Sequence, residues 1–260
     1  MKSYKTILME KREGIGYLTL NRPKVGNALN REMIHEIRDA LHLVDQDEDI
    51  RVLIVTGAGK IFQAGADVAE LKGMSPIDYL RYNTGLIGID SDLENLRQPV
   101  IAAINGAAMG GGLGLAIACT LRVMAESAKA GIPEVKVGVS PGSGLIQRLP
   151  QIVGKGRAAE MLLTGEPIDA QEAYRIGLVN RVVQDGEVVR ASEDLAKKII
   201  SNAPIAVEMT KEALQAGMDL PIEHGARYSR KNCSICFSTE DMKEGMAAFL
   251  EKRKANFQGK

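Results

Sequence analysis

Three consecutive glycines, Gly110 to Gly112, and a fourth at Gly114 stand at the start of an apolar helical pattern in NGAAMGGGLGLAIA, residues 105–118. The preceding QPVIAAING is a short apolar run typical of a buried strand. A strand, a glycine turn and a helix start bring unpaired backbone N–H groups and the positive end of the helix dipole to one point. The pattern predicts either an anion-binding site or a tight strand–helix crossing, and spacing alone leaves both open.

Two nucleotide-binding motifs fail at this loop. The P-loop pattern needs a lysine and a hydroxyl residue after its last glycine, and GGGLGL has neither. The dinucleotide pattern G-x-G-x-x-G matches Gly110 and Gly112 but then meets Leu115. The functional interpretation that remains is an oxyanion hole, in which one backbone N–H can contribute about 10²–10³ in rate.

A second small-residue loop and an isolated carboxylate complete the candidate site. AGADV, residues 64–68, follows a buried strand predicted in IRVLIVTG, so we expect it to meet the glycine run at one sheet end. Glu134 lies among apolar and small residues in AGIPEVKVG. A carboxylate with few charged neighbours has a raised pKa that suits proton transfer near neutral pH. A lone glutamate in an extended segment is also commonly a solvated edge residue.

Composition excludes several classes of function. The chain has 33 basic and 33 acidic residues, so its formal charge gives no reason to expect nucleic acid or an anionic membrane as a partner. No apolar run approaches the ~18 residues of a spanning helix, and the start of the chain lacks a secretory pattern. Three cysteines, an odd number, fit a reducing cytoplasm. Cys233 and Cys236 have C-x-x-C spacing but no second pair, so no metal is expected.

The chain divides by pattern into two parts. Residues 1–202 mix strands and helices, which predicts an α/β core that holds the site. Residues 203–260 show only helical patterns, at 204–217, 221–236 and 239–256.

Within the first part, YKTILME and GIGYLTL predict a hairpin, which argues against a simple doubly wound sheet. Asn30 predicts a helix start, and a further helix is expected at 76–96. Residues 58–73 are expected as a loop and residues 130–138 as a short extended piece.

Six segments together resemble the crotonase superfamily, the enoyl-CoA hydratases and isomerases. They are, in the family's order, LNRPKVGNALN, AGKIFQAGADVAEL, PVIAAINGAAMGGGLGLAIACTLRV, GIPEVKVGVSPGSGLIQRLPQIVGKGRAAEMLLTG, AYRIGLVNRVV and MKEGMAAFLEKRKANF. The resemblance implies a ClpP-like crotonase fold, a spiral of ββα units with a helical C-terminal trimerisation region. It also implies homotrimers, commonly paired into homohexamers, an acyl-CoA substrate, and no metal or redox cofactor.

The resemblance also implies roles for individual residues. The two backbone donors of the family's oxyanion hole fall on Ala66 and Gly111, and a catalytic carboxylate falls on Glu134. The implied substrate- and CoA-binding residues are Lys24, Ala64, Gly65, Asp67, Val68, Gly110, Gly114 and Pro133. Lys24 is equally open to being a solvated surface lysine.

The sequence departs from the family at Gly114. Hydratases of the family carry a first glutamate there and a second about 20 residues later, and only the second, Glu134, is present. Loss of an acid–base partner is expected to cost about 10²–10⁴ in rate if nothing replaces it.

Three functions therefore stay open. The first is a hydratase that uses Glu134 alone, with room at Gly114 for a bulky or cyclic dienoyl thioester. The second is a Δ3–Δ2 enoyl-CoA isomerase, in which one carboxylate moves a proton between two carbons. The third is a CoA-binding protein with little catalysis, against which a carboxylate in an apolar site argues.

Overall fold

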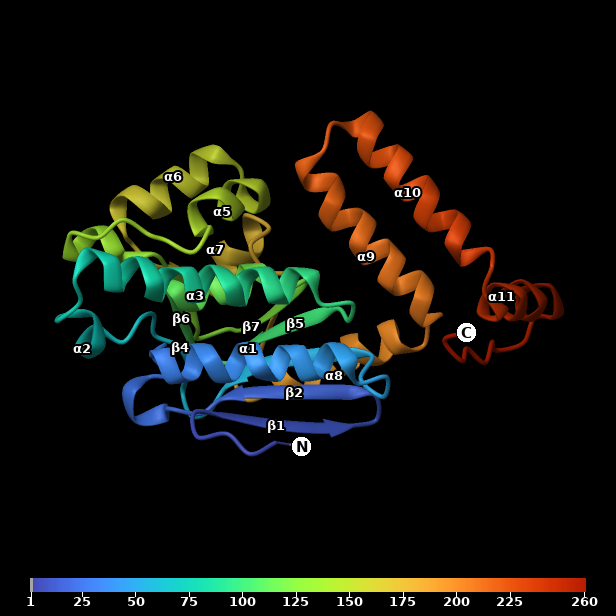
Figure 1. Cartoon of the computed structure of the whole chain (residues 1–260), viewed down its shortest axis with the longest axis horizontal. Helices are drawn as coiled ribbons and strands as arrows, with labels where there is room; N and C mark the ends of the chain where they lie inside the picture. Colours follow the sequence, from blue (N-terminus) through green and yellow to red (C-terminus); the bar gives the residue numbers. More distant parts are fainter. Residues whose placement is uncertain (1) are drawn as a thin grey trace.

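Residues 2–260, which the computed structural model describes, form two sheets surrounded by helices (Figure 1). The larger sheet contains, in spatial order, β1 (Ile7–Arg12), β2 (Ile15–Leu20), β3 (Val52–Gly57), β5 (Val100–Ile104), β7 (Leu121–Ala125) and β10 (Arg181–Val183). The smaller sheet contains β4 (Ile61–Gln63), β6 (Ala107–Met109), β8 (Lys129–Gly131) and β9 (Ile168–Asp169). The expected α/β architecture is confirmed.

Helices cover both sheets. They are α1 (Arg31–Gln46), α2 (Val68–Leu71), α3 (Pro76–Asn95), α4 (Gly111–Ala118), α5 (Leu145–Val153), α6 (Lys155–Thr164), α7 (Ala170–Arg175) and α8 (Val188–Ile200), with 3-10 helices η1 (Pro23–Val25) and η2 (Pro133–Val137). The predicted start of α1 is confirmed, because the Asn30 side chain accepts a hydrogen bond from the Met33 N–H at 2.9 Å. The sequence also predicts short helices at residues 153–165 and 169–177, where α6 and α7 lie, whereas α2, α5 and α8 are additional to those expected.

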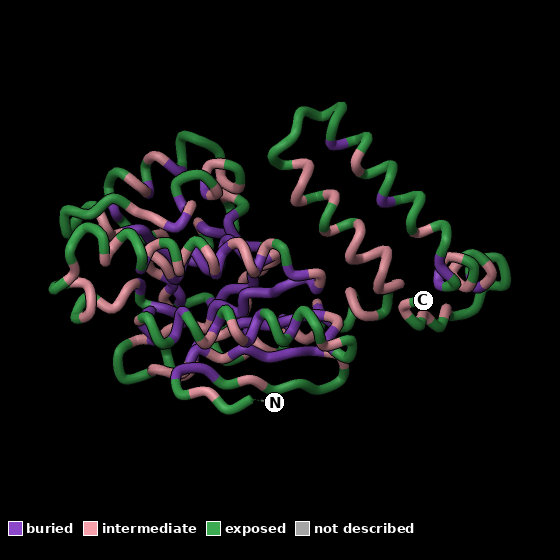
Figure 2. Tube along the Cα trace, in the orientation of Figure 1, coloured by how far each residue is buried: buried purple, intermediate pink, exposed green. Residues whose placement is uncertain are grey.

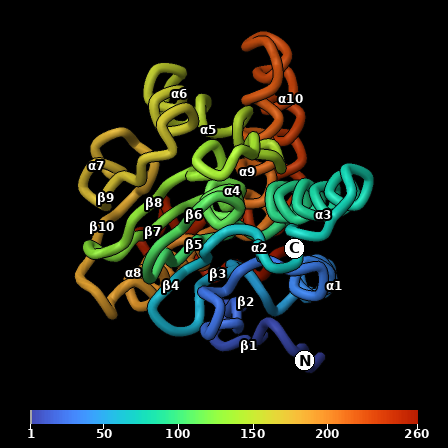
Figure 3. The backbone as a smooth tube through the Cα atoms, turned by 90° about the vertical axis from the view of Figure 1, so that its left-hand side faces the viewer, coloured from blue at the N-terminus to red at the C-terminus, as the bar shows by residue number. Residues whose placement is uncertain are grey.

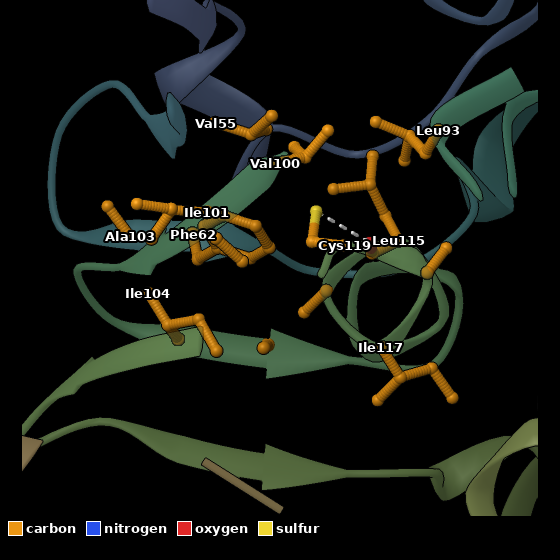
Figure 4. Packing of buried hydrophobic residues seen from close by; sticks show 14 of the residues in the cluster. Val55, Phe62, Leu93, Val100, Ile101, Ala103, Ile104, Leu115, Ile117 and Cys119 are labelled. Carbon is orange, nitrogen blue, oxygen red and sulfur yellow. Dashed lines mark hydrogen bonds between the residues drawn. The ribbon is translucent and has the colours of Figure 1, made fainter. Parts of the chain in front are cut away.

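The larger sheet explains the apolar runs of the sequence. Strands β1 and β2 form the expected antiparallel hairpin, and the remaining strands pair in parallel. All five residues of β5 are buried, as parallel strands covered on both faces require. Their side chains pack with Phe62, Leu93 and Leu115 in the core (Figure 4), where the Cys119 thiol bonds the Leu115 carbonyl at 3.3 Å.

The smaller sheet positions the two candidate loops. Strand β4 pairs in parallel with β6, and β6 pairs in parallel with β8. The chain segments that leave these three strands, beginning at residues 64, 110 and 132, therefore emerge at one edge of the sheet. Helix α4 follows β6 directly and packs against both β4 and β6.

Two sequence expectations were wrong in detail. Residues 58–73 contain β4 and α2, so the AGADV loop follows β4 and not β3. Residues 130–138 are extended only through β8, and the chain then turns into η2. Pro133 causes the change, because it has no N–H for a sheet ladder and its fixed φ suits the first position of a helix.

The C-terminal part contains the three expected helices, α9 (Pro204–Asp219), α10 (Ile222–Cys236) and α11 (Glu240–Glu251). Helices α9 and α10 form an antiparallel pair that projects away from the sheets (Figure 1). Most of this pair is exposed or half-buried (Figure 2). Among residues 2–260, no helix is long and apolar enough to cross a membrane.

Candidate active site

The loop after β4 is held by a buried glutamine. The Gln63 amide nitrogen donates to the Gly65 carbonyl, and the Gly65 N–H donates to Gln63 Oε1, both at 2.8 Å. Leu29 fixes the loop from the other side: its N–H donates to the Gly65 carbonyl at 2.9 Å, and its carbonyl accepts from the Asp67 N–H at 2.8 Å. Ala66 lies between these two bonds, and its own N–H donates to no other group within residues 2–260.

The start of α4 depends on glycine for two different reasons. Gly110, the residue before the helix, has φ +52° and ψ −120°, a conformation that side chains rarely adopt, and its N–H donates to the Gly131 carbonyl at 2.9 Å. Gly112 has no room for a side chain, because a Cβ there would lie 2.1 Å from Gln63 Oε1. The same glutamine that holds the first loop therefore also packs directly against the second.

The two loops are in direct contact. A Cβ on Gly65 would lie 3.3 Å from the carbonyl oxygen of Met109, and one on Gly111 would lie 3.5 Å from Leu29 Cδ1. As the first residue of α4, Gly111 has an N–H with no partner inside the helix, and it donates to no other described residue. The structure thus brings two unpaired backbone donors, on Ala66 and Gly111, into neighbouring loops.

Glu134 is the carboxylate beside these loops. It lies in the first turn of η2, and its Oε1 is 2.5 Å from the position that a Cβ on Gly110 would occupy. Its Oε2 is buried and makes no hydrogen bond to any described residue. Burial raises the pKa of Glu134, only partly opposed by a backbone hydrogen bond. Tyr79 of α3 lies within reach of the Glu134 charge, because its own pKa is raised first by burial and then by that charge.

Gly114 differs from the other glycines of the run. It is buried, yet an added Cβ would meet only ordinary contacts, 3.4 Å to Ser143 Oγ and 3.6 Å to Leu145 Cδ1. The fold therefore does not exclude a side chain at this position by backbone crowding. The hydroxyl of Ser143 is the polar atom closest to the place where the family carries its first glutamate.

The other predicted binding residues lie around the first loop. Ala64 and Val68 are exposed, and Lys24 is exposed on η1. Asp67 has a structural role, since it accepts from the Ala69 N–H at the start of α2 and pairs with Arg22 at 2.9 Å. These observations leave the side chains of Lys24 and Val68 free to meet a ligand at the loop.

Sequence reasoning missed Gln63 and Leu29, which connect the two loops. Gln63 is fully buried, and Leu29 is 1% exposed. The only sequence signal for Gln63 was a polar residue directly before AGADV in an otherwise apolar and small segment. Nothing in the sequence around Leu29 indicates that it would hold a loop more than 30 residues away.

The chain is similar to known enoyl-CoA hydratases over nearly its whole length. The family model described as enoyl-CoA hydratase/isomerase matches residues 10–260. A crotonyl-CoA hydratase of Syntrophomonas wolfei is 44% identical over 98% of both chains, and a short-chain-enoyl-CoA hydratase of Clostridium acetobutylicum is 42% identical over 95% of both. The crystal structure of an enoyl-CoA hydratase from Bacillus anthracis superposes with a TM-score of 0.96 at 37% identity, covering 98% of this chain and 100% of that one.

The neighbours also settle the architecture. An enoyl-CoA hydratase structure from Geobacillus kaustophilus covers the whole chain with a TM-score of 0.95 at 42% identity. The spiral arrangement expected of the crotonase fold is therefore confirmed over the full length. The chain belongs to the enoyl-CoA hydratase/isomerase family.

Proposed function

We propose that this protein adds water to an α,β-unsaturated acyl-CoA thioester, or removes it, with Glu134 as the single catalytic carboxylate. The observation that carries the proposal is the buried, unpartnered Oε2 of Glu134 beside a helix start with unpaired N–H groups. An unpartnered polar atom is costly to bury, so its presence at this site favours a role in catalysis. The names of the relatives, crotonyl-CoA hydratase and short-chain-enoyl-CoA hydratase, support the same reaction.

The proposed chemistry uses groups of this chain alone. The N–H groups of Ala66 and Gly111 donate to the thioester oxygen and stabilise the charge that develops on it. The Glu134 carboxylate takes a proton from water while the water oxygen bonds to the β-carbon, and the electron pair of the double bond moves to the thioester oxygen. Glu134 then returns that proton to the α-carbon as the enolate collapses. No cofactor is needed beyond the CoA that the substrate carries.

The raised pKa of Glu134 suits both halves of this cycle. A carboxylate with an ordinary pKa is a weak base near neutral pH. Burial destabilises the charge of Glu134 and raises its pKa toward neutral pH, so the group both accepts and returns a proton readily. We further propose that the exposed loop residues Ala64 and Val68, with Lys24 on η1, receive the CoA portion of the substrate. Lys24 would meet its phosphates.

A Δ3–Δ2 enoyl-CoA isomerase is the second candidate. The observation in its favour is the absence of a carboxylate at Gly114, because isomerisation needs one proton carrier and no water. Glu134 would then remove a proton from the α-carbon and return it to the γ-carbon. The reaction changes the position of the double bond but leaves the mass of the thioester unchanged.

Substrate size is a separate proposal. A glycine at position 114 leaves out the volume of a glutamate side chain, which favours a bulky or cyclic dienoyl thioester. Ser143 and Leu145 border this space at ordinary van der Waals distance, so the room gained is bounded on their side.

The test is incubation of the purified protein with crotonyl-CoA, a 3-enoyl-CoA and a cyclic dienoyl-CoA, followed by mass spectrometry of each thioester. We expect a gain of one water that is lost in Glu134→Gln. A shifted double bond without a mass change would establish the isomerase instead. No reaction with any of the three would overturn both proposals and return the protein to the non-catalytic CoA-binding class.

We also propose that residues 203–260 form the oligomerisation region. Helices α9 to α11 expose large apolar side chains that a monomer would leave in water: Leu214, Met218, Ile222, Ile235, Met246, Phe249 and Leu250. Light scattering on the purified protein separates a trimer from a hexamer. A monomer at micromolar concentration would contradict the proposal.

A further inference from the structure

A buried hydroxyl–carboxylate pair lies next to Gly114, outside the groups assigned above. Ser143 is 5% exposed and Asp90 is 3% exposed. Ser143 Oγ is 3.4 Å from the position of a Cβ on Gly114, and Arg148 links the two residues, because it approaches the Asp90 carboxylate at 3.4 Å and donates to the Ser143 carbonyl at 3.0 Å. The reaction proposed above uses neither residue, and burying a carboxylate is costly unless it is paired or functional.

The surroundings hold Ser143 in an uncommon conformation. Its φ is +52°, in the left-handed region that serine rarely adopts. The Asn83 side chain accepts from the Ser143 N–H at 3.2 Å, and Arg148 donates to the Ser143 carbonyl at 3.0 Å. Both backbone groups are thus fixed from neighbouring helices, which directs the hydroxyl toward α4.

Helix α3 carries a row of residues along this part of the molecule. Tyr79, Asn83 and Asp90 are spaced by four and then seven residues, so they share one helix face. Tyr79 lies close enough to Glu134 for the Glu134 charge to raise its pKa, Asn83 accepts a hydrogen bond from the Ser143 N–H, and Asp90 pairs with Arg148. Figure 3 shows α3 and α5 beside α4, and both helices contact it. The row therefore lies on a helix that packs against α4.

Four groups face the Asp90 carboxylate. Arg148 of α5 approaches it at 3.4 Å and also grips Glu94 with two hydrogen bonds, at 2.5 and 2.7 Å. Glu94 is the second of the four groups. The Cys119 thiol, after α4, and the Ser143 side chain are the third and fourth. Burial raises the pKa of Asp90 to about 7, with Arg148 opposing the rise, Glu94 adding to it and the Ser143 side chain opposing it.

Both polar groups lie beside glycines at the start of α4. Glu134 lies beside Gly110, and Ser143 lies beside Gly114. These glycines are one helical turn apart, about 6 Å at the rise of an α-helix.

We propose that the Ser143 hydroxyl, oriented by Asp90, holds the reacting water on the Gly114 side of the site and so takes the position of the missing glutamate. In this arrangement the Ser143 hydroxyl donates a hydrogen bond to the Asp90 carboxylate and accepts one from the water, whose other hydrogen faces Glu134. In the addition step the water oxygen bonds to the β-carbon, and its proton passes to Glu134. Ser143 and Asp90 neither gain nor lose a proton. Asp90 is thus a positioning residue, and the inference rests on the hydratase proposed above.

The test separates water addition from proton transfer at the α-carbon. Hydration of crotonyl-CoA needs Glu134, the backbone donors and a held water. Exchange of the α-hydrogens of butyryl-CoA in D2O needs only Glu134 and the backbone donors. Both rates are measured for the wild type, Ser143→Gly and Ser143→Ala. Glycine suits the φ of position 143, and alanine keeps its Cβ, so failure to fold in one variant leaves the other as the test.

We expect both variants to lose about 10–100-fold in hydration, the value of a hydrogen bond to a charged or reacting group, and to keep the exchange rate. Ser140→Ala, an exposed serine of the same segment, is the matched control and should change neither rate. Equal hydration in the wild type and in the Ser143 variants overturns the inference alone. Equal losses of hydration and exchange also overturn it, because they indicate a purely structural role.

The wild-type arm tests the underlying function independently. A wild type that exchanges α-hydrogens but does not hydrate overturns the hydratase and the water site together. If the wild type hydrates crotonyl-CoA, the pH dependence of the Asp90→Asn variant separates a positioning role of Asp90 from general damage to the structure. The ratio of hydration to exchange should fall in the wild type as the pH drops below about 7, and Asp90→Asn should abolish that dependence. An unchanged dependence in Asp90→Asn would show that Asp90 does not position the serine.

Discussion

The two sides of the α4 start obey different constraints. Gly112 faces Gln63, and no side chain fits there without moving the backbone of β4. Gly114, two residues later and so on the opposite side of the helix, faces Ser143 and Leu145 across ordinary contact distances. The first glycine is required by packing, whereas the second leaves space that a side chain could fill. A single glycine run therefore combines a structural requirement with a position where the chemistry of the site can vary.

The largest expected effect is on the chemical side. Glu134→Gln keeps the shape of the side chain but removes the proton carrier, so the hydration rate should fall by about 10²–10⁴. The fold should not suffer, because the variant removes a buried charge whose pKa is raised. Steady-state kinetics and thermal unfolding on the same sample check both statements. If Glu134→Gln loses stability as well as rate, the two sides of α4 do not differ in the way proposed.

Gly112→Ala should show the opposite pattern. The added Cβ would lie 2.1 Å from Gln63 Oε1 and 2.4 Å from the Gln63 carbonyl oxygen, so β4 and the loop after it must move. We expect a loss of about 3 kcal/mol in the free energy of unfolding, as for an overpacked core. Urea denaturation measures it. A stability within experimental error of the wild type would show that Gln63 can yield and that the packed side is not rigid.

The pH dependence of the rate tests the environment of Glu134. Catalysis starts from the ionised carboxylate, so kcat/KM for the exchange of α-hydrogens falls as the pH drops through the pKa of Glu134 in the free enzyme. Since burial raises that pKa, the acid limb should lie above the ordinary value of 4.5. The same shift means that Glu134 lowers the stability of the fold as the pH rises from 4.5 to its raised pKa, because the folded state holds the proton more tightly there. An acid limb of the pH profile at or below pH 4.5 would indicate that the Glu134 carboxylate is exposed to water.

The smallest effect is expected at Gly114→Ala. A methyl group at ordinary contact distance leaves Ser143 in place, and alanine is favoured over glycine within a helix by up to about 1 kcal/mol. The variant should be as stable as the wild type or slightly more so. Denaturation and kinetics run beside Gly112→Ala give the most direct contrast. A destabilisation as large as that of Gly112→Ala would remove the difference between the two glycines.

The parts of the fold that the sequence predicted have strong local patterns. The β1–β2 hairpin, the cap of α1 at Asn30, the buried run of β5 and the three C-terminal helices all follow from periodicity or from a capping residue. The smaller sheet was missed because its strands have only two or three residues, too few to show an alternation.

The candidate site was predictable to a similar extent. Short motifs indicated Glu134 and the two loops, because their residue types are unusual in such apolar surroundings. The contribution of Gln63 depends on parallel pairing of β4 with β6, and Ser143 meets Asp90 only because α3 and α5 both pack on α4. Contacts between segments more than 40 residues apart produce no sequence pattern that could be recognised in either segment alone.

The most direct test of the single-carboxylate account is the stereochemistry of water addition. Crotonyl-CoA is hydrated in D2O, and NMR of the 3-hydroxybutyryl product gives the configuration at the newly deuterated α-carbon. If Glu134 alone takes the deuteron from the water and delivers it to the α-carbon, both groups must arrive from one face, and we predict a single product of syn addition. An anti product, or a mixture of the two, would require a second proton donor on the opposite face and would contradict the account.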